Sequence, residues 1–377
     1  MTADDEHRAI QELLATLIGI PSVNPAYDPA SAGENAVGDE LARRGAAAGL
    51  LVERSDVIDG RRNVTLRLPA PQPRISVLIE GHLDTVGLPA GRQRPVARVE
   101  GGRIHGRGAC DVKGGIAAAY TAVERLAREG ALRHVDLSLL LAVDEEHAFR
   151  GITHRLATGA APDLAIVLEP TELRIVTRHH GVIRFEADVP GVSAHTSRGD
   201  GGRNAIVGAL RMIDDLERWH AARAAAGSVL TVATIRGGSA MNVVPDSCTV
   251  GVEVRTAPAD DPAAVLAEIR ALLPGEIVVR ELLADGGLLS APDGPLPRAL
   301  GAALREQGLD PRPAGVRFGT DASKLGRAGV PAVVFGPGSI DQAHADDEWV
   351  ELGDVVRASR ALHAALRHLD DAAGAAG

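Results

Sequence analysis

Two kinds of apolar segment alternate over the first half of the chain, and this alternation limits the possible folds more than any other feature. Runs that are apolar almost throughout predict strands at residues 63–70, 75–81, 135–146 and 163–171. Apolar residues at helical spacing predict helices at residues 4–17, 36–50 and 115–130. Strands that are apolar on both faces are typical of a largely parallel sheet covered by helices. Because ligands of such sheets bind beyond the carboxyl ends of the strands, function is expected there.

The pattern changes near residue 177, where strands that alternate between apolar and polar residues replace the uniform runs. From there the predicted order is strand, helix, strand, strand, helix, strand, which is that of a ferredoxin-like unit. After residue 285, uniformly apolar runs and apolar residues at helical spacing return. The chain, with 377 residues, is also longer than one ordinary domain. We therefore expect an α/β domain with a mainly parallel sheet flanked by helices, formed by residues 1–176 and 286–377. An α+β ferredoxin-like domain is expected as an insertion at 177–285.

Composition excludes several classes of function. The formal net charge of -10 offers no basic surface for nucleic acid or an anionic membrane, so a small-molecule substrate is expected. Aromatic residues make up only 2% of the chain, which disfavours stacking on sugars or bases. Its two cysteines stand in no paired motif, its acidic start is unlike a signal peptide, and no apolar run is long enough to span a bilayer. We expect a cytoplasmic protein.

Polar residues gather where the predicted strands end. His82 and Asp84 follow one strand, Glu145 and Glu146 another, and Glu169 a third. A single acid at a strand end is often a helix cap or a solvated turn. If the sheet is parallel, however, all of these groups meet at one edge, where carboxylates repel one another unless cations hold them.

Two further residues complete a candidate ligand set. Asp111 lies in the glycine-bracketed segment GRGACDVKGG before a helix, and His344 lies in the polar segment AHADDEW. The resulting set of imidazoles and carboxylates suits zinc, cobalt or manganese in a hydrolytic site. Five ligands suit two ions that share one carboxylate, and the set consists of His82, Asp111, Glu146, Glu169 and His344.

The motifs GHLDTV, GRGACDVKGG, DEE followed by Gly151, EPT, GVSAHTS, NVVPD and AHADDE occur in an order and spacing that resemble the M20 metallopeptidase family. The resemblance covers nearly the whole chain. It implies an amidohydrolase with two divalent ions, zinc in the first place and cobalt or manganese as alternatives. It also implies that the inserted domain acts as a lid and joins two copies in a homodimer.

Carried over residue by residue, the resemblance gives each ligand a role. His82 and Glu169 would bind one ion, Glu146 and His344 the other, and Asp111 would bridge them. The family's peptide bond after the bridging aspartate is commonly cis, which here means Asp111–Val112.

Two further acids of these motifs would support catalysis. Glu145 matches the catalytic base and acid. Asp84 matches an acid that supports a ligand, because two positions along an extended segment it can accept a proton from the far ring nitrogen of His82. The alternative for Asp84 is a plain turn aspartate.

In the insertion, His195 matches a histidine that in dimeric relatives reaches into the partner's active site and stabilises the oxyanion. Asn242 and Arg255 match positions that hold the carboxylate of the substrate, and Gly319 and Thr320 match a loop that contacts its backbone atoms. A solvated histidine and an exposed strand arginine are the alternatives for His195 and Arg255.

Some residues depart from the family pattern. His147 either donates a hydrogen bond to a metal ligand or is exposed. His179 and His180 stand where many relatives carry a lysine or a histidine. These three residues bear on the choice of substrate and not on the class of reaction. Cys110 has no base motif beside it and is expected to be a small packing residue.

The implied activity is hydrolysis of the amide of an N-acyl amino acid by a metal-bound hydroxide, with Glu145 as base and acid. The substrate would carry a free carboxylate, and the deacetylase and desuccinylase branch is the most similar. A dipeptidase or a glutamate-releasing carboxypeptidase is the alternative within this class. The alternative from another class of function is a homologue without catalytic activity that only binds ligands.

Overall fold

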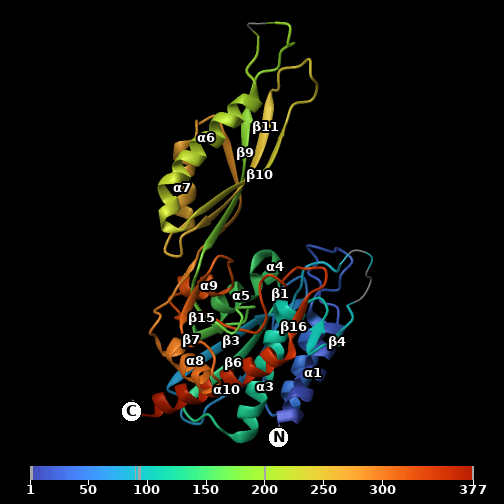
Figure 1. The fold of residues 1–377 in the computed structure, drawn as a ribbon, viewed down its shortest axis with the longest axis vertical. Helices are drawn as coiled ribbons and strands as arrows, with labels where there is room; N and C mark the ends of the chain where they lie inside the picture. Colours follow the sequence, from blue (N-terminus) through green and yellow to red (C-terminus); the bar gives the residue numbers. More distant parts are fainter. Residues whose placement is uncertain (1–2, 90, 92–94, 199–200, 376–377) are drawn as a thin grey trace. The chain divides into compact units, whose positions relative to one another are not determined.

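The computed structural model describes residues 3–89, 91, 95–198 and 201–375. The chain forms two compact units (Figure 1). The larger contains the chain up to Thr177, Ser290–Gly315 and the chain from Thr320 onward, and the smaller contains Arg178–Leu289 and Val316–Gly319. None of the helices within the described residues is both long and apolar enough to cross a bilayer.

A mixed sheet forms the centre of the larger unit. Its strands, in spatial order, are β1 (Leu51–Ile58), β2 (Arg61–Leu68), β6 (Val135–Ala142), β3 (Ile75–His82), β7 (Leu164–Val167), β15 (Ala332–Val334), β8 (Ile175–His179) and β13 (Leu288–Leu289), and β14 (Pro313–Val316) also pairs with β8. The central strands β6, β3, β7 and β15 pair in parallel, as their uniformly apolar sequences predict. β1, β2 and β8 pair antiparallel, so the sheet is less uniform than the mainly parallel one expected. β1 and β2 follow each other through a tight turn, which permits only antiparallel pairing.

Helices cover this sheet. α1 (Ala3–Gly19), α3 (Gly114–Glu129), α8 (Pro295–Glu306) and α10 (Leu352–Ala375) pack on one another, with α3 and α10 side by side (Figure 1). α2 (Asn35–Ala47), α5 (Arg150–Thr158) and α9 (Ala322–Arg327) contact other parts of the sheet. The core between these layers is mostly aliphatic, in keeping with the low aromatic content, and Tyr120 and Phe335 are its buried aromatic residues among those described.

Short elements complete the larger unit. They are α4 (Glu145–Ala148), an irregular turn η1 (Ala109–Lys113), the strand β14 (Pro313–Val316), which ends in the smaller unit, and a small antiparallel sheet of β16 (Trp349–Glu351), β5 (Arg103–His105) and β4 (Arg98–Glu100).

The smaller unit has the predicted order of strands and helices, which confirms the ferredoxin-like insertion. Its elements are β9 (Gly181–Pro190), α6 (Ala205–Arg223), η2 (Ala224–Ala226), β10 (Val229–Gly237), β11 (Ser247–Thr256), α7 (Pro262–Leu272), β12 (Val278–Asp285) and β13 (Leu288–Leu289). The antiparallel sheet has the order β10-β11-β9-β12. Asn204 and Asp261 cap α6 and α7 through their side chains.

Candidate metal centre

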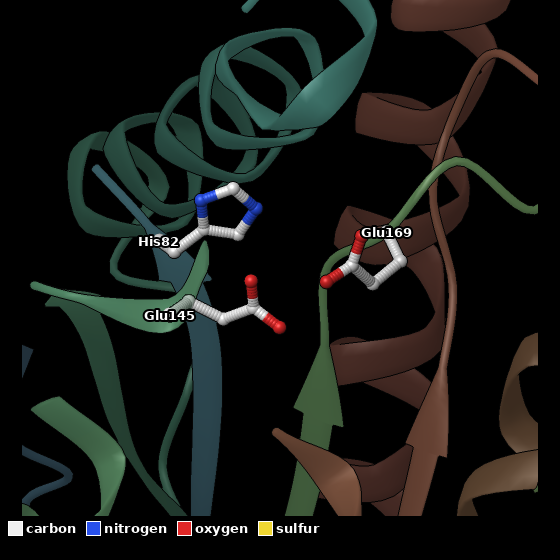
Figure 2. Close-up of side chains that lie close together, drawn as sticks. All are labelled: His82, Glu145 and Glu169. Atoms are coloured by element: carbon white, nitrogen blue, oxygen red, sulfur yellow. The ribbon is translucent and has the colours of Figure 1, made fainter. Parts of the chain in front are cut away.

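The carboxyl ends of three neighbouring parallel strands meet at one edge of the large sheet. His82, the last residue of β3, lies opposite Ala142 at the end of β6, and Glu80 lies opposite Val167 at the end of β7. The residues that follow these strands are therefore carried to the same place. Figure 2 shows the side chains of His82, Glu145 and Glu169 converging there. Their possible ligand atoms all lie within 4.8 Å of one another.

Asp111 lies between the two histidines predicted as ligands. Its Oδ1 is 3.0 Å from Nε2 of His82, and its Oδ2 is 3.3 Å from Nε2 of His344. The Asp111–Val112 peptide bond is cis, which confirms that prediction. A carboxylate that offers one oxygen toward each of two imidazoles has the arrangement that a bridging ligand requires.

Glu146 completes the side of the cluster that contains His344. Its Oε2 lies 3.1 Å from Nε2 of His344, and it forms a second compact group with His82 and Asp111. His344 is the exposed member of the set, with 53% of its side chain accessible, and its φ of 63° lies in the left-handed region. Non-glycine residues held in that region cluster at functional sites.

The acids of this cluster repel one another. Burial, followed by the charge of Asp111, raises the pKa of Glu146 and that of Glu169. Burial is also the main reason why the pKa of Glu145 lies well above its usual value. Hydrogen bonds to Asp111 and Glu146 raise the pKa of His344 to about 10. Carboxylates that take up protons when no cation is near are the donors that divalent ions stabilise, so the residues fit two such ions.

Asp84 faces Nδ1 of His82 with two acceptors, its backbone oxygen and its carboxylate. The Nδ1 atom of His82 is 3.0 Å from the backbone oxygen of Asp84 and 3.7 Å from its carboxylate, so the nearer acceptor is the carbonyl. A carbonyl only accepts, so His82 donates through Nδ1 and keeps the Nε2 lone pair for a metal. The Asp84 carboxylate instead accepts from the backbone N–H groups of Glu145, at 3.1 Å, and Glu146, at 3.2 Å.

A buried polar network lies behind Asp84, and sequence reasoning missed it. Asn24 donates from Nδ2 both to Asp84, at 2.7 Å, and to Asp144, at 2.9 Å. Arg61 joins Asp144 to Glu34 at 3.1 and 2.7 Å. The acids that precede and support Glu145 are thus fixed by partners from distant parts of the sequence. The segment PSVNP contains Asn24, but nothing local shows that its side chain reaches two acids.

Cys110, His147 and His179, which the sequence did not place among the metal ligands, lie in varied surroundings. Cys110 is buried and donates from Sγ to the carbonyl oxygen of Ser339 at 3.3 Å, and burial raises the pKa of its thiol, so it packs as predicted. His147 is exposed. His179 is buried, with Nδ1 2.9 Å from the carbonyl oxygen of His180.

The smaller unit brings His195 and Asn242 together. The backbone N–H of Thr196 donates to the carbonyl oxygen of Asn242 at 3.1 Å, and His195 forms a bridge with Val243. The ring of His195 is exposed, with Nδ1 2.7 Å from the hydroxyl of Ser197.

Arg255 lies elsewhere in the same unit. It stands near the end of β11, whereas Asn242 precedes the start of that strand. The Nε of Arg255 donates to Glu253 at 2.9 Å.

His180 and the two predicted loop residues lie in different surroundings. Burial and then the charges of Arg317 and Arg255 lower the pKa of His180. Of the two predicted loop residues, Gly319 belongs to the smaller unit and Thr320, which is buried, to the larger.

Known proteins resemble the chain over most of its length. Residues 78–368 match the model of peptidase family M20/M25/M40. An acetylornithine deacetylase of Myxococcus xanthus is 32% identical over 85% of this chain and 89% of its own. A putative succinyl-diaminopimelate desuccinylase of Mycobacterium tuberculosis is 31% identical over 92% and 95%. The fold is similar to that of a dinuclear metal binding M20 peptidase from Bacillus subtilis, with a TM-score of 0.72, 17% identity and coverage of 97% and 98%. The chain is therefore a hydrolase that belongs to the M20/M25/M40 family of metallopeptidases.

Proposed function

We propose that this hydrolase cleaves the amide bond of an N-acyl amino acid with a free carboxylate, using two divalent ions, of which zinc is the first choice and cobalt or manganese the alternatives. The observation that carries the proposal is the position of Asp111, whose two oxygens face His82 and His344 separately. The relatives named deacetylase and desuccinylase support the acyl amino acid as the substrate class.

The ligands divide into two groups around Asp111. His82 and Glu169 would hold one ion, and Glu146 and His344 the other. When bound, the ions would polarise the amide carbonyl and lower the pKa of water. Proton transfer and substrate binding would be carried out by side chains of the protein.

Glu145 is the proposed proton carrier. Burial raises the pKa of its carboxyl, which brings a carboxylate closer to the working pH of a general base. Its carboxylate points into the space shared with His82 and Glu169 (Figure 2). It would take a proton from the attacking water and pass it to the amide nitrogen, which leaves as a free amine. Asp84, through its two backbone hydrogen bonds, holds Glu145 and Glu146 in place.

We propose that the smaller unit supplies the rest of the substrate site and joins two copies. His195 would stabilise the oxyanion across a homodimer, Asn242 and Arg255 would bind the carboxylate, and Gly319 with Thr320 would contact the substrate backbone. Arg255 is paired with Glu253 in this structure, so binding a carboxylate would require it to exchange that partner.

The test is turnover by the zinc- or cobalt-loaded protein on N-acetyl amino acids, N-succinyl amino acids, dipeptides and acylglutamates, beside Glu145→Gln. Turnover of the acyl amino acids that Glu145→Gln loses by about 10²–10⁴-fold supports the proposal. Preference for dipeptides or acylglutamates would establish the peptidase alternative instead. Binding without turnover on any member would identify a silent homologue.

Complementation tests the role across subunits. His195→Ala and Glu145→Gln protomers, each inactive, should recover part of the activity when unfolded and refolded together, because a mixed dimer contains one site with both residues intact. A monomeric mass in solution, or no recovery in mixed dimers, would exclude this role for His195.

A further inference from the structure

Glu348 is a buried acid that the proposed ligand set does not use. It is 2% exposed, whereas its neighbours Asp346 and Asp347 are exposed. Its carboxylate lies beneath the loop that ends in Asp111. Oε1 accepts from the backbone N–H groups of Cys110, at 2.8 Å, and Asp111, at 2.9 Å.

The second oxygen of Glu348 is used as fully as the first. Oε2 accepts from the backbone N–H of Gly108, at 2.9 Å, and from Nη1 of Arg107, at 2.8 Å. An ionised carboxylate offers about four acceptor positions, and these donors fill them. Glu348 therefore satisfies three backbone donors of one short loop that would otherwise be buried without partners.

Glu348 is itself fixed by the backbone. Trp349, the next residue, pairs with His105 in the small antiparallel sheet, and the N–H of Gly106 donates to the carbonyl oxygen of Glu348 at 2.9 Å. The carboxylate thus projects from an anchored strand end toward the loop.

We infer that Glu348 is a positioning residue that sets the backbone of residues 108–111 and so holds Asp111 between its two histidines. The inference rests on the proposed two-ion function. Glu348 lies four residues after His344, so one short segment carries a proposed ligand of one ion and the support of the bridging ligand. The two halves of the centre are coupled through it. The ligands of a metal site must be held to within about 0.5 Å, and the hydrogen bonds of Glu348 fix the backbone that carries Asp111.

The geometry makes glutamine a poor substitute at this position. Each oxygen of Glu348 faces two donors, so either orientation of a glutamine amide turns its NH₂ group toward two N–H groups. Glu348→Gln therefore removes two hydrogen bonds with almost no change in size. Glu351→Gln is the matched control, because Glu351 lies on the same segment, is partly exposed and pairs only with Arg103 among the described residues.

The experiment compares the metal-free wild type, Glu348→Gln and Glu351→Gln by amide hydrogen exchange and by titration with Co²⁺ followed by absorbance. We expect faster exchange in the peptide covering residues 106–113 of Glu348→Gln, and binding of the second Co²⁺ weakened by about 10–100-fold. Glu351→Gln should match the wild type in both. If Glu348→Gln does not fold, Glu348→Asp, which keeps the charge but shortens the reach, should show the same changes.

Unchanged exchange in this peptide, or wild-type affinity for both ions, would overturn the inference. Failure of the proposed function looks different: the wild type itself would bind fewer than two Co²⁺ ions, while exchange in the metal-free protein would still report on the contacts of Glu348.

Discussion

The carboxylate of Asp84 accepts a hydrogen bond from the backbone N–H of Glu145 at 3.1 Å, so the proposed proton carrier is held by an acid two residues beyond the end of β3. The same carboxylate accepts from Glu146 and Asn24. One side chain thus links the segment that carries His82 to the segment that carries both glutamates. This relationship ties the histidine of one strand end to the acids of the next.

Replacing Asp84 by asparagine should therefore impair catalysis without unfolding the protein. Either orientation of the amide turns its NH₂ group toward a donor, so the Glu145 segment shifts. We expect kcat to fall by about 10–100-fold, measured on the best substrate of the panel. Asp56→Asn, on the exposed side of β1, is the control and should keep full activity. Wild-type kcat in Asp84→Asn would contradict this role.

Glu145 and Glu146 are adjacent but should respond differently to the same substitution. Glu145→Gln should retain both metal ions and lose turnover, because its role is proton transfer. Glu146→Gln should lose affinity for one ion, because it removes a charged ligand beside His344. Metal content after dialysis, measured by atomic emission, separates the two outcomes. Loss of an ion from Glu145→Gln would make Glu145 a ligand and require another base.

Gly336 should tolerate no side chain. A Cβ there would lie 2.6 Å from the carbonyl oxygen of Glu169, and backbone cannot move aside as a flexible side chain can. Gly336→Ala should destabilise the protein by about 1–3 kcal/mol and weaken metal binding, as measured by urea unfolding with and without Zn²⁺. Gly19→Ala, where a Cβ meets nothing within 4 Å, is the control. Equal stability of the two variants would show that the Glu169 backbone is free to adjust.

Metal removal should make stability depend on pH. Burial raises the pKa of Glu145 and of Glu169 above the usual 4.5, and hydrogen bonds to Asp111 and Glu146 raise that of His344 from 6.5 to about 10. Below pH 7 these groups make the folded metal-free protein bind more protons than the unfolded chain, whereas above pH 7 Lys113 acts in the opposite direction, because burial lowers its pKa from 10.5 to about 7. The free energy of unfolding should therefore fall as pH rises from 4.5 to 7.

Bound ions should reverse this dependence, because they stabilise the deprotonated ligands. Thermal unfolding at several pH values, with and without Zn²⁺, measures both slopes. A metal-free protein whose Tm rises with pH across the window would contradict the predicted excess of protons in the folded state.

The parts of the fold that the sequence predicts are those in which burial determines the order of apolar and polar residues. The central strands are apolar on both faces, and the insertion alternates because one face of its sheet is covered. β1 was missed because it is half polar and largely exposed, so Leu51–Ile58 carries little periodic signal.

The missed parts of the candidate site depend on contacts between distant residues. Asn24 reaches Asp144, 120 positions away, and Glu348 reaches Asp111, 237 positions away. In the sequence, Glu348 is the last of three consecutive acids, and nothing local separates the buried one from its solvated neighbours. The sequence pairs the carboxylate of Asp84 with His82, two residues away, but it gives no sign of the closer donors, which are the side chain of Asn24 and the backbone of Glu145 and Glu146.

The two ends of the long inserted segment are neighbours. Leu288 pairs with His179 and Leu289 with Arg178, so the chain departs and returns at adjacent positions of one antiparallel ladder. Lengthening, trimming or exchanging the stretch between them displaces no strand of the large sheet from its register. A change in the length or sequence of this segment can therefore leave the edge formed by β3, β6 and β7 as it is.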